Sequence, residues 1–376
     1  MGSPATCERE CNDNMTPERR NDIGVWVAAI LLAVAWMPGC LPQRRGLVTN
    51  PARAVADARE TLFQATTDPD GVVRSHAIEA LDYTIGIEAG EYFLAGLDDP
   101  VPSVRFASAM AIGETAYMPA KAKLLAMVGG EEADKRVLCG VIYAMYRLGD
   151  DSQMSRLAKF FDDLHPWVRA NAAFIMGKSG HPSAVQLLKD LIDDERNVDV
   201  LIRARESLAM LGDTASAMEL EGDTMGQFDD DRIDAIRALS RLGGVRAREQ
   251  LEYLTGRTDL SPLVRVAAAG GLGRMGVFSQ VGYDLCIDAV TKPSIVLKES
   301  ADDSHAPNEV DIRGLQQLAA VSLGLIGRPA AVDQLYPLLG SRDPRIRVAA
   351  ARGILQLLPS YGQTGPDVGT TEYDWP

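Results

Sequence analysis

The chain contains 376 residues, of which 46% are hydrophobic, 24% charged and only 6% aromatic, a composition typical of a folded protein with an aliphatic core. The formal net charge of −14 argues against duplex nucleic acid as a ligand, because such binding needs a basic face that neutralises phosphates. The five cysteines are too few for a disulfide scaffold in a chain of this length, and no C-x-x-C spacing of a zinc ribbon or redox pair occurs.

The first predicted element is an apolar segment near the N-terminus. An uninterrupted run of 15 residues, Ile23–Met37, follows Arg19 and Arg20. A membrane-spanning helix needs roughly 20 residues, whereas the apolar core of a signal peptide has about 7–15. The sequence therefore predicts a signal peptide over residues 1–39. Met15 is a second candidate start, because the residues before it are unusually acidic for a signal peptide.

The apolar run ends in MPGC, residues 37–40, which resembles the lipobox of bacterial lipoproteins. Gly39 and Cys40 match that pattern, and the two residues before Gly39 depart from it. The resemblance implies a lipidated Cys40, a linker over 40–49 and a place in the bacterial cell envelope. Leu41 favours the outer membrane, facing the periplasm, by resemblance to known sorting signals. The alternative is an uncleaved single-pass membrane anchor.

From residue 50 to residue 358 one short pattern recurs. A turn residue, often followed by Pro, precedes an aliphatic residue, an Arg and a run of small apolar residues, as in DPVPSVRFASAMAIGE from Asp99. The successive arginines are separated by 29–34 residues, with a single longer step of 48. A nearly constant period of this length predicts a stack of helical repeats. The marker arginines are Arg74, Arg105, Arg136, Arg169, Arg203, Arg232, Arg265, Arg313 and Arg347.

Each unit is predicted to form two short helices. In the second unit, Asp99 and Pro100 suit a helix start, because Asp accepts hydrogen bonds from free N–H groups and Pro fits the first turn. Val104 and Ile112 then share one helical face. The glycine-rich AAAGGLGRMG, residues 267–276, lies inside a predicted helix with no strand before it, so we interpret it as close packing and not as a phosphate loop.

This pattern resembles the HEAT-repeat family, most closely the short-period type also found in phycobilisome lyases. The resemblance implies an all-α, right-handed α-solenoid of about eight or nine stacked helical hairpins over residues 50–358, with a loop inserted at 291–311. It also implies a ladder of Asp and Arg side chains between adjacent repeats, and the alternative is anion binding by the row of arginines. The ladder residues are Arg74, Arg105, Arg169, Arg203, Arg265, Arg347, Asp68, Asp99, Asp163 and Asp259.

Motifs of catalysis are missing from the sequence. No HExxH, GxSxG or P-loop pattern occurs, and none of the four histidines precedes a Glu, unlike in the HEAT-like hydroxylases that hold a di-iron centre. We therefore expect no catalytic residues, no metal and no cofactor. The acidic insertion around His305 is interpreted as a solvated loop with a possible role in partner contacts. Cys139 and Cys286 are expected to be buried thiols.

The candidate partner-binding surface follows from the resemblance, since the second helix of each HEAT hairpin lines the concave face. Positions two and six residues after the aliphatic residue point away from the core stripe, and several of them are apolar. Burial of these side chains by neighbouring repeats is the alternative. The candidate residues are Phe106, Met110, Phe174, Val266, Leu318 and Arg352.

The sequence thus predicts a lipid-anchored envelope scaffold or adaptor that binds another protein and has no catalytic activity. The alternative is a lyase- or chaperone-like accessory protein that acts on a bound cofactor or client protein, which rests on analogy of fold alone. Residues 359–376 are rich in Gly, Pro and Thr and are predicted to be a disordered tail.

Overall fold

The computed structural model describes residues 49–298 and 307–359, all of which belong to the unit Leu47–Pro376. Helices make up the secondary structure in these ranges, and no β-strand occurs there. The other unit, Met1–Gly46, holds the predicted signal peptide and Cys40 and lies outside the described residues. The predicted tail also lies outside them, from residue 360 onward.

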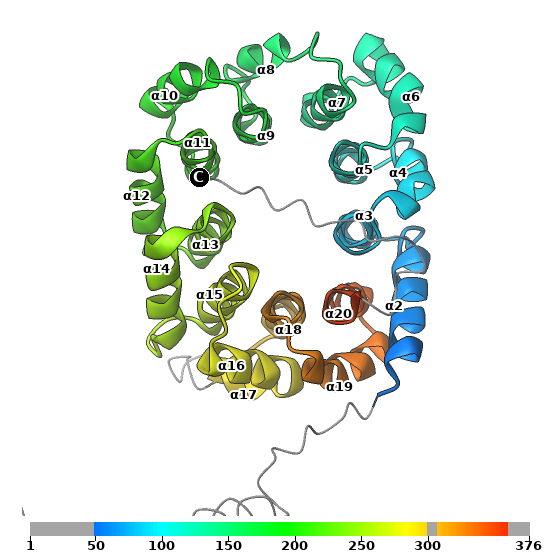
Figure 1. Cartoon of the computed structure of the whole chain (residues 1–376), viewed down its shortest axis with the longest axis vertical. Helices are drawn as coiled ribbons and strands as arrows, with labels where there is room; N and C mark the ends of the chain where they lie inside the picture. Colours follow the sequence, from blue (N-terminus) through cyan, green and yellow to red (C-terminus); the bar gives the residue numbers. More distant parts are fainter. Residues whose placement is uncertain (1–48, 299–306, 360–376) are drawn as a thin grey trace, which may run out of the picture. The chain divides into compact units, whose positions relative to one another are not determined.

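The described ranges contain nine helical hairpins, each with an outer helix followed by an inner helix (Figure 1). The all-α repeat solenoid predicted from the sequence is confirmed. The inner helices are α3 (Gly71–Thr84), α5 (Pro102–Thr115), α7 (Lys135–Arg147), α9 (Pro166–Lys178), α11 (Val198–Met210), α13 (Asp229–Leu242), α15 (Pro262–Arg274), α18 (Glu309–Ile326) and α20 (Pro344–Leu357). The outer helices are α2 (Pro51–Ala65), α4 (Gly90–Gly96), α6 (Lys121–Ala126), α8 (Ser155–Phe160), α10 (Ala184–Asp194), α12 (Thr214–Asp223), α14 (Gly244–Gly256), α16 (Gln280–Thr291) with α17 (Pro293–Lys298), and α19 (Val332–Leu335).

The inner helices begin at a repeated sequence signal. Asp70, Asp134 and Asp343 each accept a hydrogen bond from the backbone N–H group two residues later, which satisfies a donor that the helix leaves free. The N-caps of successive inner helices are 31–35 residues apart, except for the 47 residues between Ser261 and Asn308. The periodicity of the sequence is therefore the periodicity of the helix starts.

The long step contains less loop than predicted. Within the expected insertion 291–311, residues Pro293–Lys298 form α17, and α18 begins at Glu309. Asn308 and Asp311 form a reciprocal capping box there, in which each side chain accepts from the other residue's backbone. Residues 299–306 lie outside the described part.

Small residues let the inner helices approach one another closely. A Cβ atom on Gly273 of α15 would lie 2.6 Å from the backbone nitrogen of Ile326 in α18. A Cβ atom on Gly353 of α20 would likewise lie 2.6 Å from the carbonyl oxygen of Ala320. Side chains at these positions would force the backbones apart. The glycine-rich segment 267–276 therefore serves close packing, as predicted.

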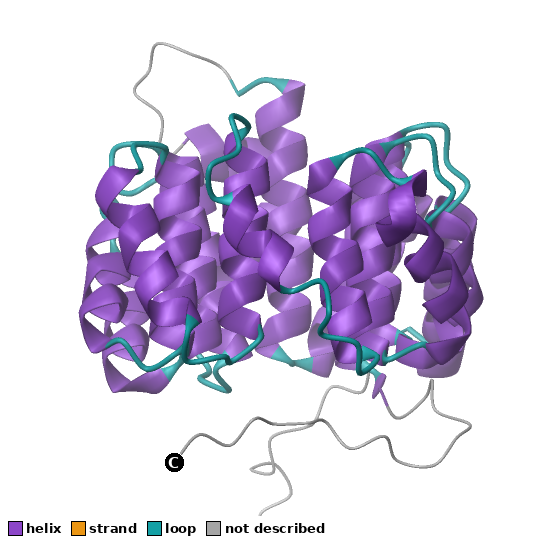
Figure 2. Ribbon diagram, turned by 90° about the horizontal axis from the view of Figure 1, so that it is seen from above, coloured by secondary structure: helices purple, strands orange, loops and turns teal. Residues whose placement is uncertain are grey.

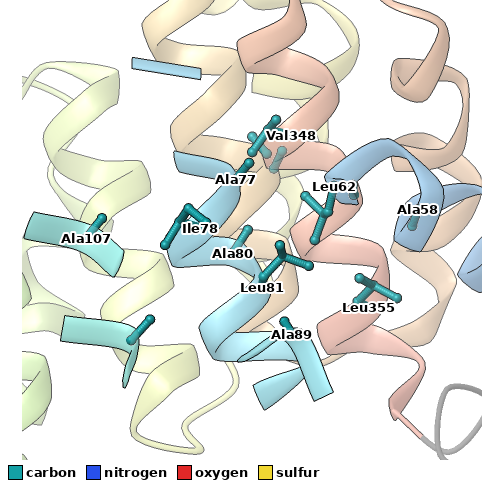
Figure 3. Packing of buried hydrophobic residues seen from close by; sticks show 14 of the residues in the cluster. Ala58, Leu62, Ala77, Ile78, Ala80, Leu81, Ala89, Ala107, Val348 and Leu355 are labelled. Atoms are coloured by element: carbon teal, nitrogen blue, oxygen red, sulfur yellow. The ribbon is translucent and has the colours of Figure 1, made fainter. Parts of the chain in front are cut away.

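Within this unit the last hairpin packs against the first, so the hairpins close into a ring (Figure 1). Leu62 and Leu81 of the first hairpin share a buried cluster with Val348 and Leu355 of α20 (Figure 3). The hydroxyl of Tyr336 also donates to the carboxylate of Asp57 at 2.6 Å. The sequence did not predict this closure, because a repeat pattern does not state the small rotation between units that sets the curvature.

The helices stand side by side, with their connecting loops gathered at two ends (Figure 2). In every hairpin the outer helix precedes the inner helix along the chain, and all inner helices begin at the same end of the ring. We call the end formed by their N-termini the start edge. The space that the inner helices surround is called the interior.

Candidate binding site in the interior of the ring

Four of the six candidate partner-binding residues are not available on the inner surface. Val266 is fully buried, and Phe106, Met110 and Leu318 are half-buried against the core. A Cβ atom on Gly140 of α7 would lie 3.0 Å from the Phe106 ring, so this side chain points at the neighbouring inner helix. The buried Val266 and the half-buried Phe106, Met110 and Leu318 are consistent with the alternative, burial by neighbouring repeats.

Phe174 and Arg352 do face the interior, and each lies nine residues after the N-cap of its helix. The guanidinium carbon of Arg203 lies 5.5 Å from the centroid of the Phe174 ring. The guanidinium carbon of Arg241 lies 6.0 Å from the same centroid, and the amine of Lys178 lies 5.5 Å away. Since α11 lies between α9 and α13 in the ring, the contact between Phe174 and Arg241 passes over the inner side of α11.

Charged side chains collect at two positions of the inner helices, nine and thirteen residues after the N-cap. These positions lie four residues apart and hence share one helical face. Acidic residues occupy three of them, and basic residues occupy six, although the whole chain has a net charge of −14. The acidic residues are Glu79, Glu114 and Glu206. The basic residues are Arg147, Lys178, Arg237, Arg241, Arg274 and Arg352.

Two of the carboxylates are shared between two cations each. The fully buried side chain of Glu206 accepts from Arg203 at 2.9 Å and from Arg241 at 2.5 Å. Glu114 of α5 pairs with Lys178 of α9, which lies two helices further along the ring. These pairs neutralise charge that would otherwise be costly to bring together.

Asp82 of α3 has a strongly perturbed acidity. Burial raises its pKa from 3.8 to about 7, and the nearby negative charges of Glu114 and Glu79 act in the same direction. The positive charges of Lys178 and Arg352 oppose this shift without cancelling it. Asp82 therefore changes its charge near neutral pH.

Arg274 and Arg352 differ from the other interior cations. Neither forms a hydrogen bond or an ion pair with any residue in the described part of the chain, and the Nε atom of Arg352 is buried without a partner. The guanidinium carbon of Arg352 lies 4.4 Å from the centroid of the Tyr83 ring, a cation–π contact. Burial lowers the pKa of both arginines, and each also feels the positive charge of another arginine. We call Arg274 and Arg352 the unpaired arginines.

Arginines at the start edge are paired instead. We call an arginine that is paired with a carboxylate of the next hairpin a rung of the ladder. In three rungs the arginine Nε and Nη2 atoms donate to the two oxygens of one carboxylate. For Arg74 and Asp99 the distances are 2.7 and 2.8 Å. Nη1 of Arg74 also donates to the carbonyl oxygen of Asp68, at 2.8 Å. Such bidentate pairs join adjacent repeats with specific geometry. The three rungs are Arg74–Asp99, Arg105–Glu132 and Arg169–Glu195.

The carboxylate of Glu195 shows how strong this pairing is. Burial by itself would raise its pKa, but hydrogen bonds from Arg169 and from the backbone N–H groups of Asn197 and Arg196 outweigh that effect. The result is a pKa lowered from 4.5 to about 2. The ladder predicted from the sequence contained only Asp as carboxylates, whereas two of the three carboxylates in the rungs are Glu132 and Glu195.

The other predicted ladder arginines do not form such rungs within the described residues. Arg203 binds Glu206 of its own helix, and Arg265 donates to the carbonyl oxygen of Thr255 at 3.4 Å. Arg347 donates to the carbonyl oxygen of Ser341 at 2.9 Å. Arg203 is out of register, because a rung arginine lies four residues after its N-cap and Arg203 lies six after Asn197.

The remaining ladder carboxylates have other partners. Asp163 accepts a hydrogen bond from Lys135, and Asp259 pairs with Arg257 two residues earlier. Asp68 accepts from the backbone N–H of Asp70 at 2.9 Å. At the joint between the last and the first hairpin, an ion pair of 2.6 Å between Arg345 and Asp70 takes the place of a rung.

Large apolar side chains are exposed at the start edge, which the sequence analysis missed. Leu164 is 98% exposed and Trp167 is 58% exposed, on either side of the N-cap His165 of α9. These exposed residues could have been predicted from the sequence. Each lies within two positions of an N-cap, and the first turn of an inner helix projects toward solvent. Further exposed apolar residues at this edge are Val72, Val198, Phe228 and Val310.

Metal ligands and membrane spans are not found in the part of the chain that the structure describes. It contains no group of three or more His, Cys, Asp or Glu side chains placed to hold a metal ion, and none of its helices is long and apolar enough to cross a membrane. Cys139 and Cys286 are buried thiols, as predicted.

The fold and the interior define a closed α-helical repeat protein with a charged inner surface. Residues 154–222 match the family described as HEAT repeats. The chain therefore contains HEAT repeats, as the sequence pattern predicted. A comparison with curated protein sequences gives no match.

Two solved structures are similar to the chain. Human deoxyhypusine hydroxylase, in complex with glycerol, is 15% identical, with a TM-score of 0.34, and the alignment covers 82% of this chain and 99% of that one. The complex of CpcE and CpcF of phycocyanin lyase from Nostoc sp. PCC7120 is 16% identical, with a TM-score of 0.40, and the alignment covers 69% of this chain and 98% of that one. Similarity at this level does not extend to activity.

Proposed function

We propose that the protein is a lipid-anchored scaffold of a bacterial cell envelope that binds another protein through the start edge of its ring. The observation that supports this proposal most directly is the exposure of Leu164, at 98%, and of Trp167, at 58%, at one edge. Removing such side chains from water on docking stabilises a complex, and Trp is a frequent anchor of protein interfaces.

The proposed location rests on Cys40 and on the apolar run before it. Removal of residues 1–39 and acylation of Cys40 would place the ring outside the cytoplasmic membrane. The intact mass of the protein recovered from membranes, compared with that of a Cys40→Ala variant, tests this. A mass matching an acylated chain that begins at Cys40, lost in the variant, is expected. The same unprocessed mass in both proteins would contradict the lipid anchor.

The proposed edge is tested by replacing Leu164 and Trp167 together with Ser. Both side chains are exposed, so helical content and the unfolding midpoint should stay close to those of the parent protein. Crosslinking to the partner in native membranes should fall about tenfold or more. Val245→Ser is the matched control, because Val245 is 72% exposed but belongs to the outer helix α14. Equal crosslinking by all three proteins would refute the edge as the interface.

The proposed role includes no catalytic step. A purified protein that carries a coloured or otherwise detectable cofactor would favour the alternative, a lyase- or chaperone-like accessory protein. An uncoloured protein that crosslinks through the start edge would favour the scaffold.

A further inference from the structure

The unpaired arginines come together from distant parts of the sequence. Arg352 of the ninth hairpin contacts the ring of Tyr83 in the first, and Arg274 of the seventh interacts electrostatically with both. Arg241 of the sixth hairpin adds a fourth group, since its charge acts on Arg274 and on Tyr83. Closure of the ring is what gathers these side chains in the interior.

Neighbouring arginines of the interior have carboxylate partners that Arg274 and Arg352 lack. Arg241 has the carboxylate of Glu206 at 2.5 Å, and Arg237 has that of Asp234 at 2.9 Å. Arg274 and Arg352 have no such partner among the described residues, although each lies in the field of another guanidinium. Glu206 and Glu79 attract these two arginines without pairing with them, and Arg274 and Arg352 also repel each other. An anion that binds both guanidinium groups directly would relieve this repulsion.

The geometry points to a binding site in the interior for a doubly charged oxyanion of the phosphate type, held between Arg274 and Arg352. Guanidinium groups present planar forks of N–H donors that match phosphate oxygens in pairs. A phosphoryl group carries a charge of about −1.5 to −2 at neutral pH, which balances two arginines.

The surroundings suit such a ligand. The Tyr83 side chain is 57% exposed, so the site is open to solvent, and its hydroxyl provides a further hydrogen-bond donor. The Nε atom of Arg352 is a buried donor without an acceptor. Arg352 and Tyr83 belong to the last and first hairpins, so an anion bound there would also stabilise the closed ring. The site is independent of the proposed partner edge, which lies at the opposite end of the inner helices.

Isothermal titration of the purified protein with inorganic phosphate tests the inference, with chloride at equal ionic strength as the reference. We expect saturable binding of one phosphate per chain and no saturable binding of chloride. Arg274→Gln and Arg352→Gln should each weaken phosphate binding about tenfold or more, because a charge-assisted hydrogen-bonded pair is lost. These variants should fold, since neither residue loses a hydrogen bond or ion pair and Arg352→Gln removes only the cation–π contact with Tyr83.

Arg248→Gln is the matched control. It removes one positive charge from the outer helix α14, where Arg248 binds Glu252, and should leave phosphate binding unchanged. A peptide containing phosphoserine separates the two sources of the group: tighter binding than inorganic phosphate means that the phosphoryl group arrives attached to a larger molecule, and weaker binding means a free anion. No saturable binding of either ligand, or equal binding by the parent and both interior variants, would overturn the inference.

Discussion

The start edge and the interior of the ring hold arginine in opposite circumstances. At the start edge, Arg74, Arg105 and Arg169 each donate two hydrogen bonds to a carboxylate of the next hairpin. In the interior, Arg274 and Arg352 have no carboxylate partner within the described ranges. The first set is a structural device that joins repeats. The second set of arginines has no hydrogen-bonded carboxylate, which leaves their N–H donors available for an anion.

The difference teaches that an arginine repeated at HEAT spacing has no fixed role. At that spacing, Arg265 and Arg347 donate to backbone carbonyl oxygens, and the role of the arginine depends on whether the following repeat places a carboxylate within reach. Glu195 does so for Arg169, and its lowered pKa of about 2 reflects a strong pair. For the unpaired arginines, burial lowers the pKa instead, because the lost hydration outweighs the attraction of Glu206 on Arg274 and of Glu79 on Arg352, neither of which forms a hydrogen-bonded pair with them.

The largest effect is expected from breaking a rung. Arg169→Gln should lower the free energy of unfolding by about 2 kcal/mol, because the largely buried carboxylate of Glu195 loses its charged partner. Chemical denaturation followed by circular dichroism measures this, with Arg248→Gln as the control on the outer surface. A loss no larger than that of the control would mean that the rungs do not hold the repeats together.

Acid should weaken the same rung more gradually. The pKa of Glu195 is about 2 in the folded protein against 4.5 in its unperturbed state, so the folded state disfavours protonation. Stability from this pair is therefore complete above about pH 5 and is lost as the pH falls toward 2. A Glu195→Gln variant should show a smaller loss of the unfolding midpoint between pH 5 and pH 3 than the parent. Parallel pH profiles of the two proteins would contradict the assignment.

Asp82 should show a pH dependence of the opposite sign. Its pKa is raised to about 7 by burial and by Glu114 and Glu79, with Lys178 and Arg352 opposing. The folded state therefore binds this proton more tightly than the unfolded chain, and stability falls as the pH rises from about 4 to 7. Asp82→Asn should raise the unfolding midpoint at pH 8 and leave it nearly unchanged at pH 4. An unchanged midpoint at pH 8 would show that the interior does not perturb this carboxyl.

The smallest effect is expected from an unpaired arginine. Arg274→Gln in phosphate-free buffer should change the free energy of unfolding by no more than about 0.5 kcal/mol, or raise it, because no pair is lost and repulsion from Arg241 is relieved. The same denaturation experiment used for Arg169→Gln measures it. A loss as large as that of Arg169→Gln would remove the contrast between edge and interior.

The sequence was sufficient for the repeat architecture because caps, prolines and small residues act locally. The cap Asp343 and the packing glycine Gly273 both do in the structure what their sequence context indicates. The ladder was predicted only in part, since Arg203 matches the spacing but is two residues out of register with its cap.

The candidate site was largely beyond sequence reasoning, because it depends on ring closure. Phe174 and Arg352, six residues after the aliphatic marker, were among the candidates from the sequence, and their side chains contact charged or aromatic groups of the interior. Arg241 and Arg274 lie thirteen residues after their N-caps, and the sequence analysis missed them. A charged residue in the last turn of a helix rich in small residues could have indicated their place on the inner surface. That Arg352 meets Tyr83 could not be foreseen, since the two are joined only where the last hairpin reaches the first.

The most direct test of the contrast is the unfolding midpoint as a function of phosphate concentration, measured in parallel for the parent protein, Arg352→Gln and Arg105→Gln. A ligand that binds only the folded state adds about 2.7 kcal/mol at a hundred times its dissociation constant. We predict that phosphate raises the midpoint of the parent and of the edge variant equally, and not that of Arg352→Gln. An equal rise in all three proteins would contradict the account, since the anion would then act somewhere other than at the unpaired arginines.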